Sequence, residues 1–87
     1  MITSYPQYRM LSNGKSYYKI IDSSTMEEIQ LMSNRYAIHN LSASILPERL
    51  LIQDILNLQD GLYTVVDESE YLDVMARCER ELERIYI

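Results

Sequence analysis

Hydrophobic residues are densest between residues 45 and 66, where the pattern predicts a helix followed by a strand. Pro47 suits the first helical position, and the negative charge of Glu48 is favoured in the first turn. The apolar stripe is wider than a surface helix needs and comprises Leu50, Leu51, Ile52, Ile55, Leu56 and Leu58. Gly61 can end the helix in the left-handed conformation, before the β-forming residues 62–66. We expect this unit to form the core with its stripe buried on two sides; a partner-binding groove or dimer seam is the alternative.

Residues 6–21 predict a hairpin centred on Asn13-Gly14, a signal for a type I′ turn in which both central residues have positive φ. Pairing outward from this turn gives one face with Pro6, Tyr8, Met10, Tyr17, Lys19 and Ile21. The other face carries Gln7, Arg9, Leu11, Ser16, Tyr18 and Ile20. The first face is slightly more apolar, so we expect it to be covered and the second to stay free. Pro6 near the strand start is typical of an edge strand.

Residues 23–44 fit two patterns. Helical features are a capping box at Thr25 and Glu28 and apolar residues at Met26, Ile29, Met32 and Tyr36. A hairpin turning at Ser33-Asn34 instead gives an apolar face, with the pairs Leu31–Tyr36 and Ile29–Ile38. Its mainly polar face has the pairs Met32–Arg35, Gln30–Ala37 and Glu28–His39, the segregation that a half-buried antiparallel sheet requires. We favour strands, because a helix leaves Leu31, Ile38 and Leu41 off its stripe.

The last residues predict a helix that begins near Asp67, a capping residue followed three positions later by Glu70. Its narrow apolar stripe comprises Leu72, Met75, Cys78, Leu82 and Ile85. The rest of the helix surface is highly charged, which is typical of a helix laid on a sheet.

These elements predict an α+β fold in the order ββββαβα, formed by a single domain of residues 1–87. The sheet is an antiparallel β-meander of about four to five strands. We expect both helices to pack on one face of this sheet.

Charge is distributed unevenly along the chain, whose net charge is −5. Residues 1–40 carry a net charge of +1, and residues 41–87 carry −6. An acidic chain repels the phosphate backbone, which disfavours nucleic acid and an anionic membrane surface as partners. No apolar run approaches the length of a membrane span, the N-terminus lacks signal-peptide features, and Cys78 is the single cysteine. These features predict a cytoplasmic protein, most simply a bacterial one.

The residues offer little for catalysis or metal binding. A Cys–His pair would require Cys78 to meet His39, yet Cys78 lies on the apolar helix stripe, where a buried inert thiol is usual. His39 opposite Glu28 is better explained as a solvated pair. One His and one Cys do not supply a zinc site, and two glycines do not make a phosphate loop. We therefore expect no catalytic residue, metal, cofactor or small-molecule substrate, and no enzymatic activity.

Eight tyrosines, with no Phe and no Trp, are the most unusual feature of the composition. Tyrosine is a good strand former, but it is also enriched at protein interfaces. We therefore predict a protein-binding domain whose partner is an unidentified protein or a second copy of itself. The candidate surface is the hairpin face away from the helices, with Arg9, Leu11, Tyr18 and Ile20. The alternative is a single-stranded nucleic-acid-binding module that uses the Tyr, Lys and Arg side chains of the N-terminal hairpin.

Overall fold

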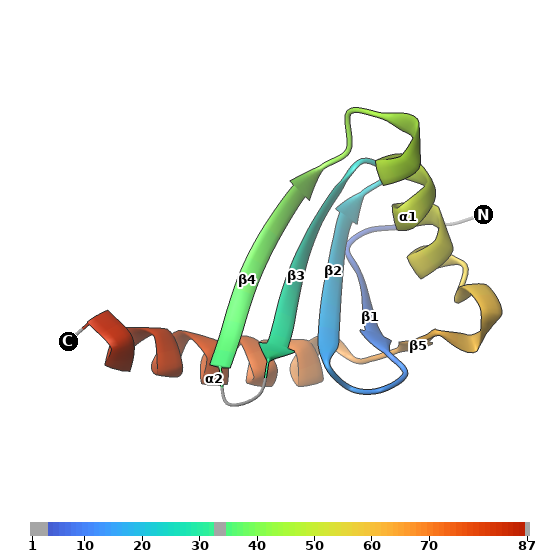
Figure 1. Ribbon diagram of the computed structural model, residues 1–87. Coiled ribbons are helices and arrows are strands. Elements are labelled where there is room, and N and C mark those ends of the chain that lie inside the picture. The colour runs from blue at the N-terminus through green and yellow to red at the C-terminus, as the bar shows by residue number, and fades with distance from the viewer. Residues whose placement is uncertain (1–3, 33–34, 87) are drawn as a thin grey trace.

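The computed structural model describes residues 4–32 and 35–86, with side chains described up to residue 80. Its strands are β1 (Gln7–Leu11), β2 (Ser16–Asp22), β3 (Thr25–Met32), β4 (Arg35–Ser42) and β5 (Tyr63–Val65). Its helices are α1 (Leu46–Leu56), the short 3₁₀ helix η1 (Gln59–Gly61) and α2 (Glu68–Tyr86). The α+β class and the order ββββαβα are therefore confirmed (Figure 1).

The strands form one antiparallel sheet in the order β4-β3-β2-β1-β5. Both predicted registers are confirmed: Arg9 pairs with Tyr18 across the first hairpin, and Ile29 pairs with Ile38 across the second. Residues 23–44 are thus strands, and the helical alternative is wrong. The predicted turn at Ser33-Asn34 lies outside the described residues. The expectation that the first strand is an edge is also wrong, because β5 pairs with the second half of β1.

The turn between β1 and β2 differs from the predicted type I′ turn. The Gly14 N–H donates to the Leu11 carbonyl at 2.8 Å, and Asn13 Oδ1 accepts the Lys15 N–H at 2.8 Å. Gly14 has φ of 74°, but Asn13 is not among the residues with positive φ. The asparagine side chain therefore stabilises the turn by bonding to the backbone two residues on, and only glycine takes the left-handed conformation.

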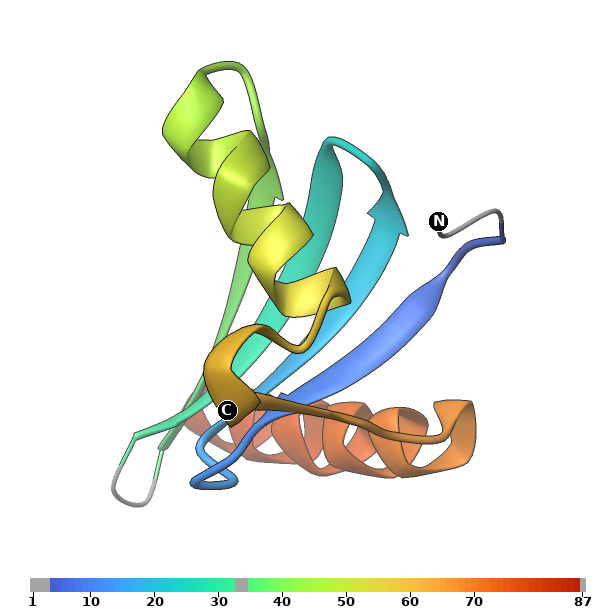
Figure 2. The ribbon, with the colours of Figure 1, turned by 90° about the vertical axis from the view of Figure 1, so that its right-hand side faces the viewer.

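The two helices lie on opposite faces of the sheet, so the expectation that both pack on one face is wrong (Figure 2). Alternation along the strands places Ile20 and Met26 toward α1, and Ile29 toward α2. Each face therefore carries apolar side chains that require cover. The chain can supply both covers because β5 occupies the edge beyond β1, from which α2 crosses beneath the other face (Figure 1).

Helix α1 begins as predicted, but it ends earlier than Gly61. Pro47 stands in its first turn, and the Glu48 carboxylate accepts the backbone N–H groups of Ser44 and Ile45 at 3.0 and 3.3 Å. These hydrogen bonds lower the pKa of Glu48. Helical structure stops at Leu56, and Gly61, with φ of 68°, lies at the end of η1 instead.

Helix α2 buries a stripe that matches the predicted one at Cys78 and partly at Met75, but not at Leu72. Its buried side chains are Tyr71, Val74 and Cys78, at spacings of three and four residues, whereas Leu72 is half exposed. Leu72 follows Tyr71 directly and points about 100° around the helix from it. Met75 is partly buried against this cluster, and the side chains of Leu82 and Ile85 lie outside the described residues.

Tyrosines connect α2 to the sheet. The Tyr71 hydroxyl donates to Glu27 Oε1 on β3 at 2.7 Å, and its ring packs 5.2 Å from the ring of Tyr8 on β1. Burial and the hydrogen-bonded Glu27 carboxylate raise the pKa of Tyr71. On the opposite face, burial and the nearby Glu28 raise the pKa of Tyr18 to about 12. The neutral phenols are therefore part of the packing of both layers.

The two sides of α1 predict unequal effects of truncation. Ile55→Ala should lower the free energy of unfolding by about 2–5 kcal/mol, because it removes a fully buried side chain. Leu51→Ala should cost less than about 1 kcal/mol, because Leu51 is exposed on the other side of the helix. Urea denaturation measures both, and equal losses for the two variants would contradict this assignment of faces.

Stability should decline at alkaline pH. Burial raises the pKa of Tyr18, Tyr71 and Cys78 above their unfolded values of 10.0, 10.0 and 9.0. The unfolded chain therefore binds fewer protons than the folded chain above about pH 9, so the free energy of unfolding falls as pH rises. Tyr71→Phe should cost about 1–2 kcal/mol at neutral pH through the lost hydrogen bond, and should make the alkaline decline shallower. Denaturation series from about pH 8 to about pH 11.5 test this, and equal slopes for both proteins would contradict it.

Candidate interaction surface

The structure places most of the predicted interaction surface in the core. Arg9, Tyr18 and Ile20 are only 4, 7 and 0 % exposed, and Leu11 is partly buried. These residues lie on one face of the hairpin as expected, but that face is covered by α1. The expectation of a free surface here is therefore wrong, because the sheet is covered on both faces rather than on one.

Arg9 is held in this core by hydrogen bonds from its guanidinium group. Its Nη1 donates to the Tyr8 carbonyl at 2.9 Å and to Gln7 Oε1 at 3.3 Å, and its Nη2 donates to the Leu56 carbonyl at 3.4 Å. Burial lowers the pKa of Arg9. Leu56 is the last residue of α1, whose final carbonyls carry partial negative charge, and α1 has no basic residue in its own last turn. The guanidinium therefore supplies from β1 the positive charge that the end of α1 favours.

The tyrosines of the N-terminal hairpin are also engaged in packing. Tyr18 meets the ring of Tyr63 edge-on at 5.7 Å between centroids, and Tyr8 packs against Tyr71. Tyr17 packs against the buried cluster beneath α2. Base stacking requires an accessible aromatic face, and the rings of Tyr8, Tyr17 and Tyr18 make contacts within the chain.

His39 and Cys78 lie on opposite sides of the sheet. Cys78 is buried beneath α2, where burial raises the pKa of its thiol, whereas His39 is exposed on the face that bears α1. His39 pairs with Glu28 across β3 and β4 as predicted, but the Glu28 carboxylate accepts a hydrogen bond from Gln30 Nε2 at 3.2 Å. Within the described residues, no three His, Cys, Asp or Glu side chains gather in a way that could hold a metal ion.

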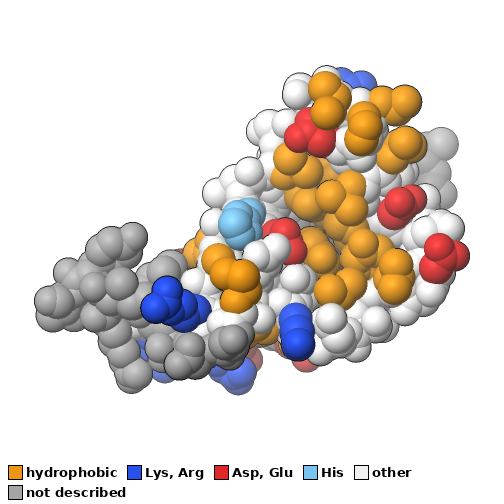
Figure 3. All heavy atoms as spheres, viewed as in Figure 1, with side chains coloured by type: hydrophobic (Ala, Val, Ile, Leu, Met, Phe, Trp, Pro, Cys, Tyr) orange, Lys and Arg blue, Asp and Glu red, His pale blue; other side chains and the backbone are white. Residues whose placement is uncertain are grey.

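An exposed apolar surface lies instead on the outer side of α1 and continues to β5. Among the described residues, seven of the ten exposed large hydrophobic side chains fall in this segment, here called the α1 patch. They are Ile45, Leu46, Leu50, Leu51, Leu58, Leu62 and Val65. Figure 3 shows hydrophobic side chains gathered over α1 and extending below it across the front of the molecule. The opposite side of the helix buries Ile52, Ile55 and Leu56.

The sequence contained a signal for this surface. The stripe of α1 is wider than one buried face requires, and the structure covers only one side of it. The expectation of burial on two sides is therefore wrong within the described chain. The alternative interpretation, an apolar seam available to a partner, agrees with the exposure of Leu46 and Leu50.

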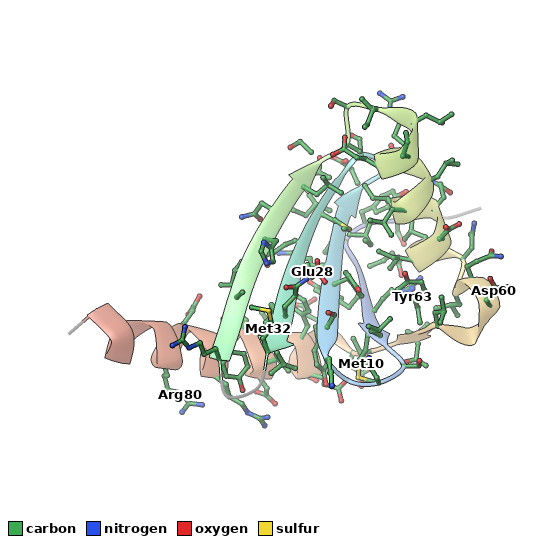
Figure 4. All side chains as sticks on the ribbon, viewed as in Figure 1. Met10, Glu28, Met32, Asp60, Tyr63 and Arg80 are labelled. Carbon is green, nitrogen blue, oxygen red and sulfur yellow. The ribbon has the colours of Figure 1, made fainter. Side chains whose placement is uncertain are left out.

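The turn after α1 holds part of the α1 patch in a strained conformation. Leu58 has φ and ψ of 56° and 44°, and Asp60 has φ of 55°. A left-handed backbone is a genuine outlier for a bulky residue such as leucine and costs about 1–2 kcal/mol. The turn ends the helix and directs the chain into β5, while Asp60 projects at the outer end of the molecule (Figure 4).

Charged residues are interspersed along the sequence with the residues of the α1 patch. Glu48, Asp54 and Asp60 are acidic, and Arg49 is the single basic residue between Ile45 and Val65. The segment that carries the patch therefore has a net charge of −2. Interaction sites commonly combine an apolar centre with polar or charged groups at the rim.

No family model, curated protein or solved structure matches the chain. Within the described residues, no helix combines the length and the apolar character needed to cross a membrane.

A pair of variants at one position tests the strain at Leu58. Leu58→Gly and Leu58→Ala remove the same contacts of the leucine side chain, but only glycine adopts positive φ freely. We expect the glycine variant to be more stable than the alanine variant by about 1 kcal/mol. Within a helix the order is the reverse, so Gln53→Gly should be less stable than Gln53→Ala and serves as the control. An alanine variant as stable as the glycine variant at position 58 would argue against strain.

Proposed function

We propose that this protein is a non-enzymatic protein-binding domain that binds another protein through the α1 patch. The observation that supports it is the apolar outer side of α1, where Leu46 is 66 % exposed and Leu50 is 52 % exposed. Contiguous exposed apolar surface is costly in water, and in folded proteins it commonly marks an interaction site. The strained turn at Leu58 adds to this argument, because strained backbone often occurs where function requires a fixed geometry.

The charge around the patch favours a particular kind of partner. The segment that carries the patch has acidic Asp54 and Asp60 and a net charge of −2, so a complementary surface would be apolar with a basic rim. A second copy bound symmetrically through the same patch would place acidic segment against acidic segment, since a two-fold interface uses one surface twice. Like charges in contact are unfavourable, so we propose a different protein as the partner at this surface.

The test compares two matched variants with the wild-type protein. Leu46→Gln/Leu50→Gln replaces two exposed residues of the patch, and Leu72→Gln replaces a residue on α2 that is also 52 % exposed. The free energy of unfolding, measured by thermal melts, should change by less than about 0.5 kcal/mol in both variants, because the three replaced side chains are at the surface. Immobilised wild-type and Leu72→Gln proteins should retain the same protein from a native lysate, and the double variant should lose it.

Calorimetry with the purified partner should then show an affinity reduced by more than about tenfold in the double variant alone. The same calorimetric titration at two salt concentrations tests whether the partner has a basic rim. If it has, added salt should weaken binding by screening its attraction to the acidic residues of this chain. Retention of the same proteins by the wild-type protein and by both variants would contradict the proposed function.

A further inference from the structure

Among the described residues, the sheet has one long open edge, formed by β4. This strand has eight residues, Arg35–Ser42, whereas the strand at the other edge, β5, has only three. Proteins usually protect a long edge with proline, a bulge or inward-pointing charges. β4 has none of these devices: it contains no proline, and its register with β3 is continuous over eight pairs. Its charged residue, Arg35, stands at the very start of the strand.

The hydrogen bonds identify which backbone groups face this edge. The Ala43 N–H donates to the Ser24 carbonyl at 2.6 Å, and the register continues from this pair into β4 and β3. Residues whose backbone groups face a partner strand alternate along an antiparallel pair. The odd-numbered residues of β4 therefore bond to β3, and the even-numbered ones direct their N–H and C=O groups outward. The outward-facing residues are Tyr36, Ile38, Asn40 and Ser42.

Helix α2 extends the layer beneath this edge. It packs under the start of β4, where Tyr36 and Ile38 contact its buried cluster. In Figure 1 the helix continues well past β4, and Figure 4 shows Arg80 on the projecting part. Helix α2 therefore extends beyond the edge of the sheet that it covers. A further strand beside β4 would lie above the projecting turns of α2.

We propose that β4 pairs antiparallel with β4 of a second copy of this chain, which joins two sheets into one. The outward-facing groups are self-complementary, because a two-fold axis brings even-numbered residues opposite even-numbered residues. The register that uses all four places Tyr36 opposite Ser42 of the second copy and Ile38 opposite its Asn40. The two Arg35 side chains then lie at opposite ends of the strand pair, and the two His39 side chains lie opposite each other at the two-fold axis.

The projecting helices fit the same symmetry. Each α2 crosses near the start of its own β4, so in an antiparallel pair the two helices lie at opposite ends and do not collide (Figure 1). Each projecting part would lie beneath the end of the other copy's β4, where Asn40 and Ser42 are exposed. This surface is separate from the α1 patch, so the inference goes beyond the proposed function and fails or holds independently of it.

The first test is the mass of the full chain by sedimentation over about micromolar to about millimolar concentration. The wild-type protein should form a dimer. Asn40→Pro removes one outward N–H and leaves the bonds to β3 intact, a position where an edge strand tolerates proline. It should raise the dissociation constant at least about tenfold, because symmetry removes two hydrogen bonds at once. Asn40→Ala keeps the N–H and should still dimerise.

Hydrogen exchange of the wild-type protein tests the same pairing without any variant. The amides of Tyr36, Ile38 and Asn40 should become protected as the concentration rises, whereas the amides of Ala37 and His39 should be protected at every concentration. A monomer at all concentrations would overturn the inference. A dimer whose even-numbered amides stay unprotected, or that is dissociated by Leu46→Gln/Leu50→Gln but not by Asn40→Pro, would overturn it as well.

Discussion

Alternation along β2 and β3 places Ile20 and Met26 on one face of the sheet and Ile29 on the other, and the rest of the structure depends on this division. A meander with apolar side chains on both faces cannot leave either face in water. Two helices are available, and each must serve a different face. The chain resolves this constraint through β5, which occupies the edge beyond β1 before α2 crosses the opposite face.

Because α1 and α2 cover opposite faces of the sheet, only one side of α1 is buried. In the described part of the chain, α1 covers one face of the sheet and has no second layer above it, so it buries only the side that carries Ile52, Ile55 and Leu56. Its outer apolar residues remain in water, beside a turn held by left-handed Leu58 and Asp60. Arg9 stabilises the last carbonyl of the same helix from beneath. The helix is thus fixed from the sheet side and carries its exposed residues on the other, which is the arrangement an interaction surface requires.

The two proposed surfaces lie at different parts of the molecule. The α1 patch extends from α1 to β5, which forms one edge of the sheet, and β4 forms the other edge. One offers apolar side chains in an acidic segment, and the other offers backbone hydrogen-bonding groups on a nearly uncharged strand. A dimer joined at β4 would therefore leave two α1 patches available, and it would present them as a pair.

The sequence by itself determined the elements, their order and both hairpin registers. Local physical chemistry decides these features: side-chain alternation sets the register of Ile29 with Ile38, and Pro47 with Glu48 sets the start of α1. The details differ at Gly61, where left-handed Leu58 already turns the chain after α1, and along the stripe of α2, where Tyr71 is buried. The end of α1 meets Arg9, and Tyr71 reaches Glu27 on β3.

Only the tertiary structure decided which face each helix covers, and with it the candidate surface. The two faces of the first hairpin are almost equally apolar, and the structure covers both of them, one with α1 and the other with α2. The predicted surface of Arg9, Tyr18 and Ile20 lies under α1 for that reason. The wide stripe of α1 signalled that apolar residues needed cover on two sides, but no local rule could show that the described part of the chain covers only one of them. That outcome depends on the position of β5, a contact between β1 and a strand more than fifty residues later in the chain.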